Sequence, residues 1–124
     1  MKYTQLSIGS TKHSDGGHIG IDFFAYDGSP ALFIYDPKTK QRVMMATIVI
    51  VEGMWSLEEN QVFLKDYSEN EGLLEAMRRA GLIEITGMAF TSGFVDVDIV
   101  EIKSPLKELI AIARNDRAEL REAA

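Results

Sequence analysis

The chain of 124 residues has no cysteine, which excludes disulfide bonds, thiolate zinc sites and a cysteine nucleophile. Long apolar stretches are also missing. The longest, residues 43–51, is interrupted by Thr47 and is too short to span a bilayer. The N-terminus lacks the apolar segment that is typical of a secretory signal. We therefore expect a soluble, cytoplasmic protein.

Basic side chains are scarce where a nucleic-acid surface would need them. The net charge is -6, and residues 1–53, 54–102 and 103–124 contribute 0, -7 and +1. Because binding to a nucleic-acid backbone requires a stripe of Lys and Arg, we expect no direct binding of DNA or RNA. The acidic middle segment is interpreted as a solvated face or as a surface complementary to a basic partner, and mimicry of nucleic acid stays open.

The remaining composition suits a single folded domain over residues 1–124. Hydrophobic residues make up 46% of the chain, unlike a disordered sequence. A chain of this size buries roughly two-thirds of its unfolded surface, so it needs no metal or disulfide to fold. Residues 115–124 are the exception, because Leu120 is their only large apolar side chain. We predict a frayed helix end there, or one that a second chain orders.

The first half of the chain shows strand periodicity. Alternating apolar residues predict strands at residues 2–8, 19–26, 31–35 and 43–51. Between the first two lies a polar, glycine-containing loop at residues 9–18. Short turns with Pro, Gly and Asp join the others. Consecutive strands with short connections indicate an antiparallel meander.

In the second half, a short extended segment is predicted at residues 61–64 and a brief strand at residues 88–91, after an apolar segment at residues 82–85. Residues 94–102 form the clearest strand of this half. Residues 54–60 between the two halves are expected to form a loop or short turn. In the last strand the apolar side switches after Ile99 to Val100. Such a switch costs one step of register, so we predict a β-bulge near these two residues.

A central helix is predicted between these strands. Ser68 followed three residues later by Glu71 is a capping box, so the helix should begin at Ser68. Gly81 is placed to end it in a left-handed conformation. The apolar stripe between these ends consists of Leu73, Leu74, Met77 and Ala80.

A second helix is predicted at the C-terminal end. It opens with Ser104 as a capping residue and Pro105 at the first helical position. Its apolar stripe consists of Leu106, Leu109, Ile110 and Ala113. The sequence therefore predicts an α+β fold, in which the central helix and the C-terminal helix pack on an antiparallel sheet of about five strands.

Metal and cofactor chemistry has little support. His13 and His18, with Asp15 between them, lie in a glycine-containing loop, but their spacing matches no metal signature. The glycines of this loop precede a strand, whereas a phosphate-binding loop precedes a helix. We predict no metal site and no cofactor, and the role of the His13 to His18 loop stays open.

One catalytic alternative comes from the last strand. Asp96 and Asp98 share a face, with carboxylates roughly 7 Å apart at a rise of about 3.3 Å per residue. Glu101 and Lys103 follow, and this pattern is typical of metal-dependent nucleases or hydrolases, in which carboxylates hold Mg²⁺ and the lysine stabilises the attacking water. The competing interpretation is a solvated outer strand face.

Two groups of residues are candidates for contacts with another protein. Trp55, the only tryptophan, stands in the predicted loop, where it either anchors an interface or covers one end of the core. The second group is polar and lies at the junction between strand and helix, where internal hydrogen bonds are the alternative. It consists of Lys65, Asp66, Tyr67, Glu69 and Asn70.

The same junction carries a family resemblance. The stretch VFLKDYSENEGLLEA (residues 62–76), continued by AGLIE (80–84), Thr86-Gly87 and SGFV (92–95), resembles a family of small bacterial proteins of unknown function. Members occur in conjugative elements, plasmids and prophages. The resemblance covers about residues 43–102, and the N-terminal loop and the C-terminal helix depart from it.

This resemblance implies an accessory protein of a mobile genetic element, without catalytic residues to carry over. Our leading hypothesis is therefore a non-enzymatic protein-binding or regulatory module, with an inhibitor of a host defence protein as one form. A small metal-dependent nuclease or hydrolase is the alternative. A homodimer built through the C-terminal helix is the third hypothesis.

Overall fold

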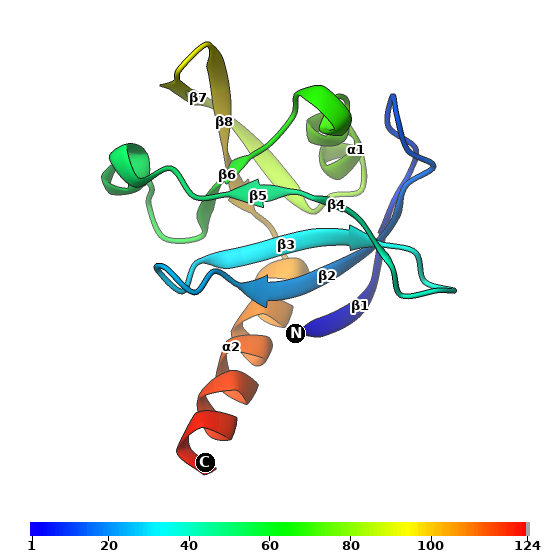
Figure 1. Cartoon of the computed structure of the whole chain (residues 1–124), viewed down its shortest axis with the longest axis vertical. Coiled ribbons are helices and arrows are strands. Elements are labelled where there is room, and N and C mark those ends of the chain that lie inside the picture. Colours follow the sequence, from blue (N-terminus) through cyan, green and yellow to red (C-terminus); the bar gives the residue numbers. More distant parts are fainter. Residues whose placement is uncertain (124) are drawn as a thin grey trace.

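The computed structural model describes the backbone of residues 1–123 and the side chains of residues 1–118. It contains two antiparallel sheets of four strands each, with two α-helices (Figure 1). The predicted α+β class is confirmed, although the strands form two sheets rather than one. The two sheets and both helices enclose a shared main core.

The first sheet has the strand order β1-β2-β3-β4, so the predicted meander is confirmed. Its strands are β1 (Lys2–Ile8), β2 (Gly17–Phe23), β3 (Pro30–Tyr35) and β4 (Arg42–Met45). Ile19, Ile21, Leu32 and Ile34 point into the main core. Strand alternation therefore turns the residues between them to the opposite, outer face.

The single strand expected at residues 43–51 is wrong, because the chain passes from one sheet to the other at Ala46. The Ala46 N–H donates to the Leu32 carbonyl of β3 (2.8 Å), and the Ala46 carbonyl accepts from Lys65 N–H (2.9 Å). Ala46 is fully buried between these partners. Beyond it, β5 (Thr47–Ile48) belongs to the second sheet.

The second sheet has the order β5-β6-β8-β7. Its other strands are β6 (Gln61–Leu64), β7 (Ile83–Ser92) and β8 (Val95–Ile102). The bulge predicted within β8 is wrong, because β8 pairs with β6 in unbroken register. The irregularity lies opposite, in β7, where Thr86 and Gly87 are inserted. Ile99 and Val100 are both buried because the two faces of β8 are covered by different clusters.

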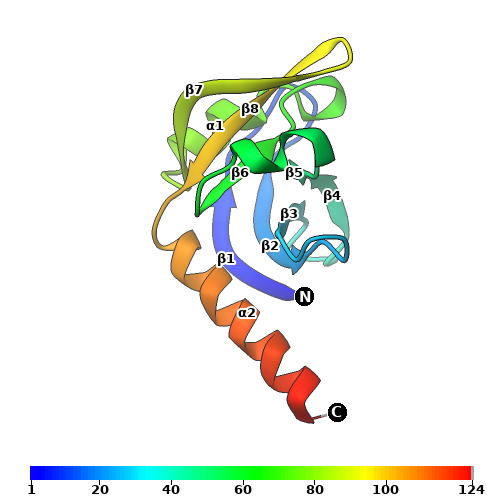
Figure 2. The same ribbon diagram turned by 90° about the vertical axis from the view of Figure 1, so that its left-hand side faces the viewer.

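The helices cover the main core at two places. Helix α1 (Leu73–Arg79) buries Leu73 and Met77, and helix α2 (Leu106–Ala123) buries Leu106, Ile110 and Ala113. The stripe predicted for the C-terminal helix is confirmed. The backbone of α2 continues beyond the sheets (Figure 2). The expectation of a frayed end rests on Leu120, whose side chain lies outside the described residues.

A smaller cluster lies on the outer face of the second sheet. Ile50, Phe63, Val97 and Ile99 form it. It is covered by the 3₁₀-helix η1 (Val51–Ser56), which replaces the expected loop. Gly53 permits this close packing, since a Cβ there would stand 2.9 Å from the rings of Phe63 and Phe90. Segment η1 and the β7–β8 hairpin therefore meet at this end of the molecule.

Candidate functional site

The polar junction that the sequence singled out lies between β6 and α1. The capping box predicted at Ser68 is wrong, because residues 68–70 form the separate 3₁₀-turn η2 (Ser68–Asn70) and α1 begins at Leu73. Asp66 caps the helix instead: its Oδ1 accepts the N–H groups of Gly72 (3.1 Å) and Leu74 (2.9 Å). Gly72 has a φ of 94°, a conformation that favours glycine.

Asn70 is turned inward rather than toward a partner. Its side chain is 0% exposed, and its Nδ2 donates to the carbonyl of Met45, next to the sheet crossover. The following residue, Glu71, holds the β1–β2 loop: its carbonyl accepts the Lys12 N–H (3.2 Å), and its carboxylate lies 3.2 Å from Lys12 Nζ and 3.7 Å from His13 Nε2. The junction therefore joins α1, the crossover and this loop.

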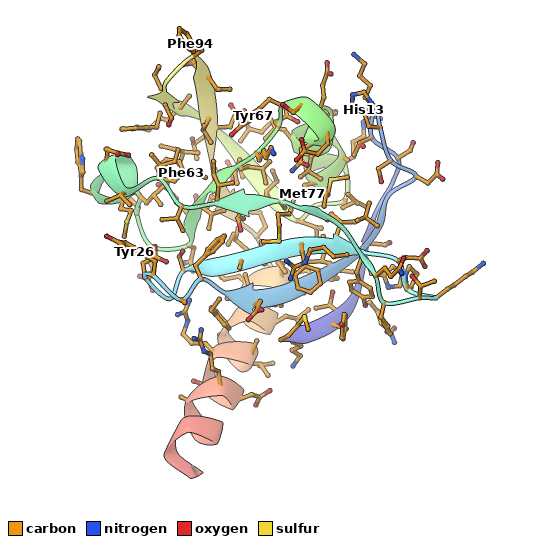
Figure 3. All side chains as sticks on the ribbon, viewed as in Figure 1. His13, Tyr26, Phe63, Tyr67, Met77 and Phe94 are labelled. Carbon is orange, nitrogen blue, oxygen red and sulfur yellow. The ribbon has the colours of Figure 1, made fainter. Side chains whose placement is uncertain are left out.

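The other junction residues pair with each other. Lys65 Nζ donates to Glu69 Oε1 (2.5 Å), and this bond holds the pKa of the Glu69 carboxyl below its usual range. The same ammonium group lies 5.4 Å from the centre of the Tyr67 ring, which packs against the smaller cluster. Figure 3 shows Tyr67 at this junction. Of the predicted contact residues here, only Glu69 is exposed; Asn70 is buried, and the other three are half-buried.

Replacing Asp66 by alanine is expected to lower the free energy of unfolding by about 0.5–2 kcal/mol, because the change removes the cap of α1. Chemical denaturation measures the effect. Asp66→Asn should recover part of the stability, since its amide oxygen can still accept the two N–H groups. Glu69→Ala, which removes an exposed ion pair, should cost less. A loss for Glu69→Ala equal to that for Asp66→Ala would contradict this role.

The acids of the nuclease alternative are divided between the two faces of β8. Asp96 and Asp98 share one face, and Glu101 lies on the other. Thr91 Oγ1 donates to Asp96 Oδ1 (2.6 Å), and Lys103 Nζ donates to Glu84 Oε2 (3.1 Å). These positions do not bring Asp96, Asp98, Glu101 and Lys103 into one site.

Burial raises the pKa of the Asp98 carboxyl, and the neighbouring charges of Asp66 and Asp96 raise it further. Across the described part of the chain, no three His, Cys, Asp or Glu side chains are grouped so as to hold a metal ion. His13 interacts with Glu71, whereas the His18 ring packs edge-on against Tyr35 with centroids 5.8 Å apart. The two histidines therefore contact different partners, Glu71 and Tyr35.

Trp55 is the predicted contact residue that the structure leaves most open. Its side chain is 83% exposed, yet its Nε1–H donates to the Glu52 carbonyl (2.8 Å), which fixes the indole on η1. Met88 on the adjoining hairpin is 57% exposed, and Phe94 at the hairpin tip is fully exposed (Figure 3). We call Trp55, Met88 and Phe94 the η1–hairpin surface.

Sequence reasoning missed two members of this surface. The sequence assigns both residues to the strands predicted at residues 88–91 and 94–102, without a role in contacts with another protein. The Ser92-Gly93 turn is the available signal for Phe94, because a residue beside a tight turn stands at the end of the hairpin. Met88 had no such signal: it shares the η1-covered face with Ile99 because of the insertion in β7.

No described helix is long and apolar enough to cross a membrane. Comparison of the chain with protein-family models, with curated proteins and with solved structures gave no match.

Proposed function

We propose that the chain is a non-enzymatic module that binds another protein through the η1–hairpin surface. The observation that carries this proposal is that three large apolar side chains are exposed on two elements that pack against each other, η1 and the β7–β8 hairpin: Trp55, Met88 and Phe94. Exposed apolar side chains on neighbouring elements are candidates for an interaction site.

The way Trp55 is held supports this assignment. Its hydrogen bond to Glu52 holds the indole on η1, and the packing of Gly53 against Phe63 and Phe90 holds η1 on the sheet. Binding of a partner therefore costs little conformational entropy for ordering the Trp55 side chain. Tryptophan is also enriched among the residues that contribute most to binding. The junction residues support the fold rather than this surface, since Asp66 caps α1 and Asn70 donates to the Met45 carbonyl beside the crossover.

The sequence resemblance to proteins of mobile elements suggests where such a partner is found. We propose that the partner is a host protein, and more specifically a host defence protein. Affinity capture from a lysate of the native host, followed by mass spectrometry, identifies candidates. Because apolar contacts carry the proposed interaction, the partner should remain bound at high salt.

Trp55→Ala is expected to weaken binding of the captured partner by about tenfold or more, as for a residue at the centre of an interface. Calorimetry or surface plasmon resonance with purified components measures the change. Ile112→Ala is the matched control, because Ile112 is an exposed apolar residue on α2. Equal affinities of the wild type and Trp55→Ala would overturn the assignment.

The same surface could be covered by a second copy of the chain, and sedimentation at several concentrations tests this. A dimer that Trp55→Ala dissociates would replace the proposed foreign partner by self-association. A dimer that only changes in α2 dissociate would instead support the third hypothesis drawn from the sequence.

A further inference from the structure

A second surface is formed on the outer face of the first sheet, away from η1. The strand register places Tyr3 beside Gly20, Gly20 beside Phe33, and His18 beside Tyr35. These residues alternate with the apolar residues that enter the main core, so they share the outer face. Residues from β1, β2 and β3, distant in the sequence, thereby meet as one aromatic group.

The rings of this group are fixed by packing. Tyr3 and Tyr35 meet edge to face, with centroids 4.7 Å apart, and the Tyr35 hydroxyl donates to the Thr4 carbonyl (2.6 Å). The Phe33 ring lies over Gly20, where an added Cβ would stand 2.1 Å from ring atoms. Phe33 and Tyr35 are buried by this packing, whereas Tyr3 is 40% exposed.

Cations lie over these rings. Lys40 Nζ stands 4.9 Å from the Tyr3 centroid and 5.2 Å from that of Tyr35, and Arg42 Cζ stands 4.6 Å from the centroid of Phe33. Lys38 is exposed on the same turn as Lys40. We call Tyr3, His18, Lys40 and Arg42 the aromatic–basic face, and Lys38 adjoins it in sequence.

No carboxylate of the described residues lies within 4.0 Å of Lys38, Lys40 or Arg42. The acid of the same turn, Asp36, accepts the N–H of Lys38 through its Oδ1. In a chain of net charge -6, a group of cations without acidic partners is a local exception.

We infer that the aromatic–basic face binds single-stranded nucleic acid. Lys38, Lys40 and Arg42 would contact phosphates, while unpaired bases would stack on the open parts of Tyr3 and His18. Positive charge beside aromatic rings on a sheet is the arrangement that single strands favour, because every base has a flat face. A duplex hides these faces, and an acidic peptide carries rings only where aromatic residues interrupt its carboxylates.

The sequence alone predicts no direct binding of DNA or RNA, because residues 1–53 have a net charge of 0 and no segment of the chain carries a stripe of Lys and Arg. Folding places Lys40 and Arg42 over rings of β1 and β3, where the described residues offer them no carboxylate within 4.0 Å. The local surface charge therefore differs from the average of the segment.

Fluorescence anisotropy with a labelled single strand of about 12 nucleotides tests the inference at low salt, about 50 mM. We expect the wild type to bind, and Lys40→Ala/Arg42→Ala to bind about tenfold or more weakly. Losing two phosphate contacts should also reduce the slope of log K against log salt by about 1.4. Tyr3→Leu should weaken binding, and Tyr3→Phe should retain it.

The matched control is Lys12→Ala/Lys103→Ala, which removes the same charge from lysines that pair with Glu71 and Glu84. It should bind like the wild type if the face is specific. Absence of binding by the wild type would overturn the inference, as would an equal loss in both double variants. Equal binding of duplex DNA, or equal competition by poly-glutamate, would overturn it in favour of a general anion surface or an acidic protein.

Discussion

Leu73→Ala is expected to lower the free energy of unfolding by about 2–5 kcal/mol, the range for large-to-small changes in a packed core. Leu73 is the first residue of α1, is 0% exposed and belongs to the main core with Met77. Truncation removes the contacts that seat the helix against the sheets. Urea denaturation should show a lower midpoint with an unchanged slope, because the surface exposed on unfolding stays nearly the same.

Leu74 is the matched control for this prediction, because it has the same side chain at the next position but is only partly buried at the edge of the core. Leu74→Ala should therefore cost clearly less than Leu73→Ala. Equal losses would mean that Leu73 does not contribute more to the main core than Leu74 does. A changed slope would point instead to an altered unfolded state.

The body and the end of α1 could be predicted from the sequence because their causes are local. The spacing of Leu73 and Met77 defines the buried face, and Gly81 ends the helix as predicted. Gly81 has a φ of 74°, and the next N–H, that of Leu82, donates to the Met77 carbonyl (3.1 Å). The start could not be predicted, because the capping oxygen belongs to Asp66, which lies several residues upstream.

The division into two sheets could not be predicted from periodicity. Residues 43–51 are apolar apart from Thr47, and nothing within them distinguishes one long strand from two short ones. The break at Ala46 depends on two tertiary hydrogen bonds, one to Leu32 in β3 and one to Lys65, the residue after β6. In the same way, the switch after Ile99 has two explanations in the sequence, a bulge or two buried faces, and only the partner strands decide between them.

The candidate surfaces show the same division between local and distant causes. The loop position of Trp55 could be predicted from the sequence, but not its exposure, because an aromatic residue in a loop either anchors an interface or covers one end of the core. The aromatic–basic face could not be identified, since the register of several strands brings Tyr3 and His18 beside Phe33 and Tyr35. Polar residues at a junction are ambiguous from sequence, because hydrogen bonding inside the fold and contact with a partner require the same side chains.

Asn70→Ala is expected to lower the free energy of unfolding by about 1–3 kcal/mol, because it leaves the Met45 carbonyl without its partner beside the sheet crossover. Asn70→Asp should cost at least as much, since it keeps the size of the side chain but places an acceptor against that carbonyl. Thermal and urea denaturation measure both variants. The side chain is 0% exposed, so partner affinity should stay unchanged at temperatures where the variant remains folded.

These two substitutions separate a structural role of the junction from a role in binding. Glu69→Ala, one residue away and exposed, is the control and should change stability by less than about 0.5 kcal/mol. If Asn70→Ala proved as stable as the wild type while losing the partner, Asn70 would have to leave its buried position on binding. The expected result, lost stability with retained affinity, assigns Asn70 to the crossover and leaves recognition to the η1–hairpin surface.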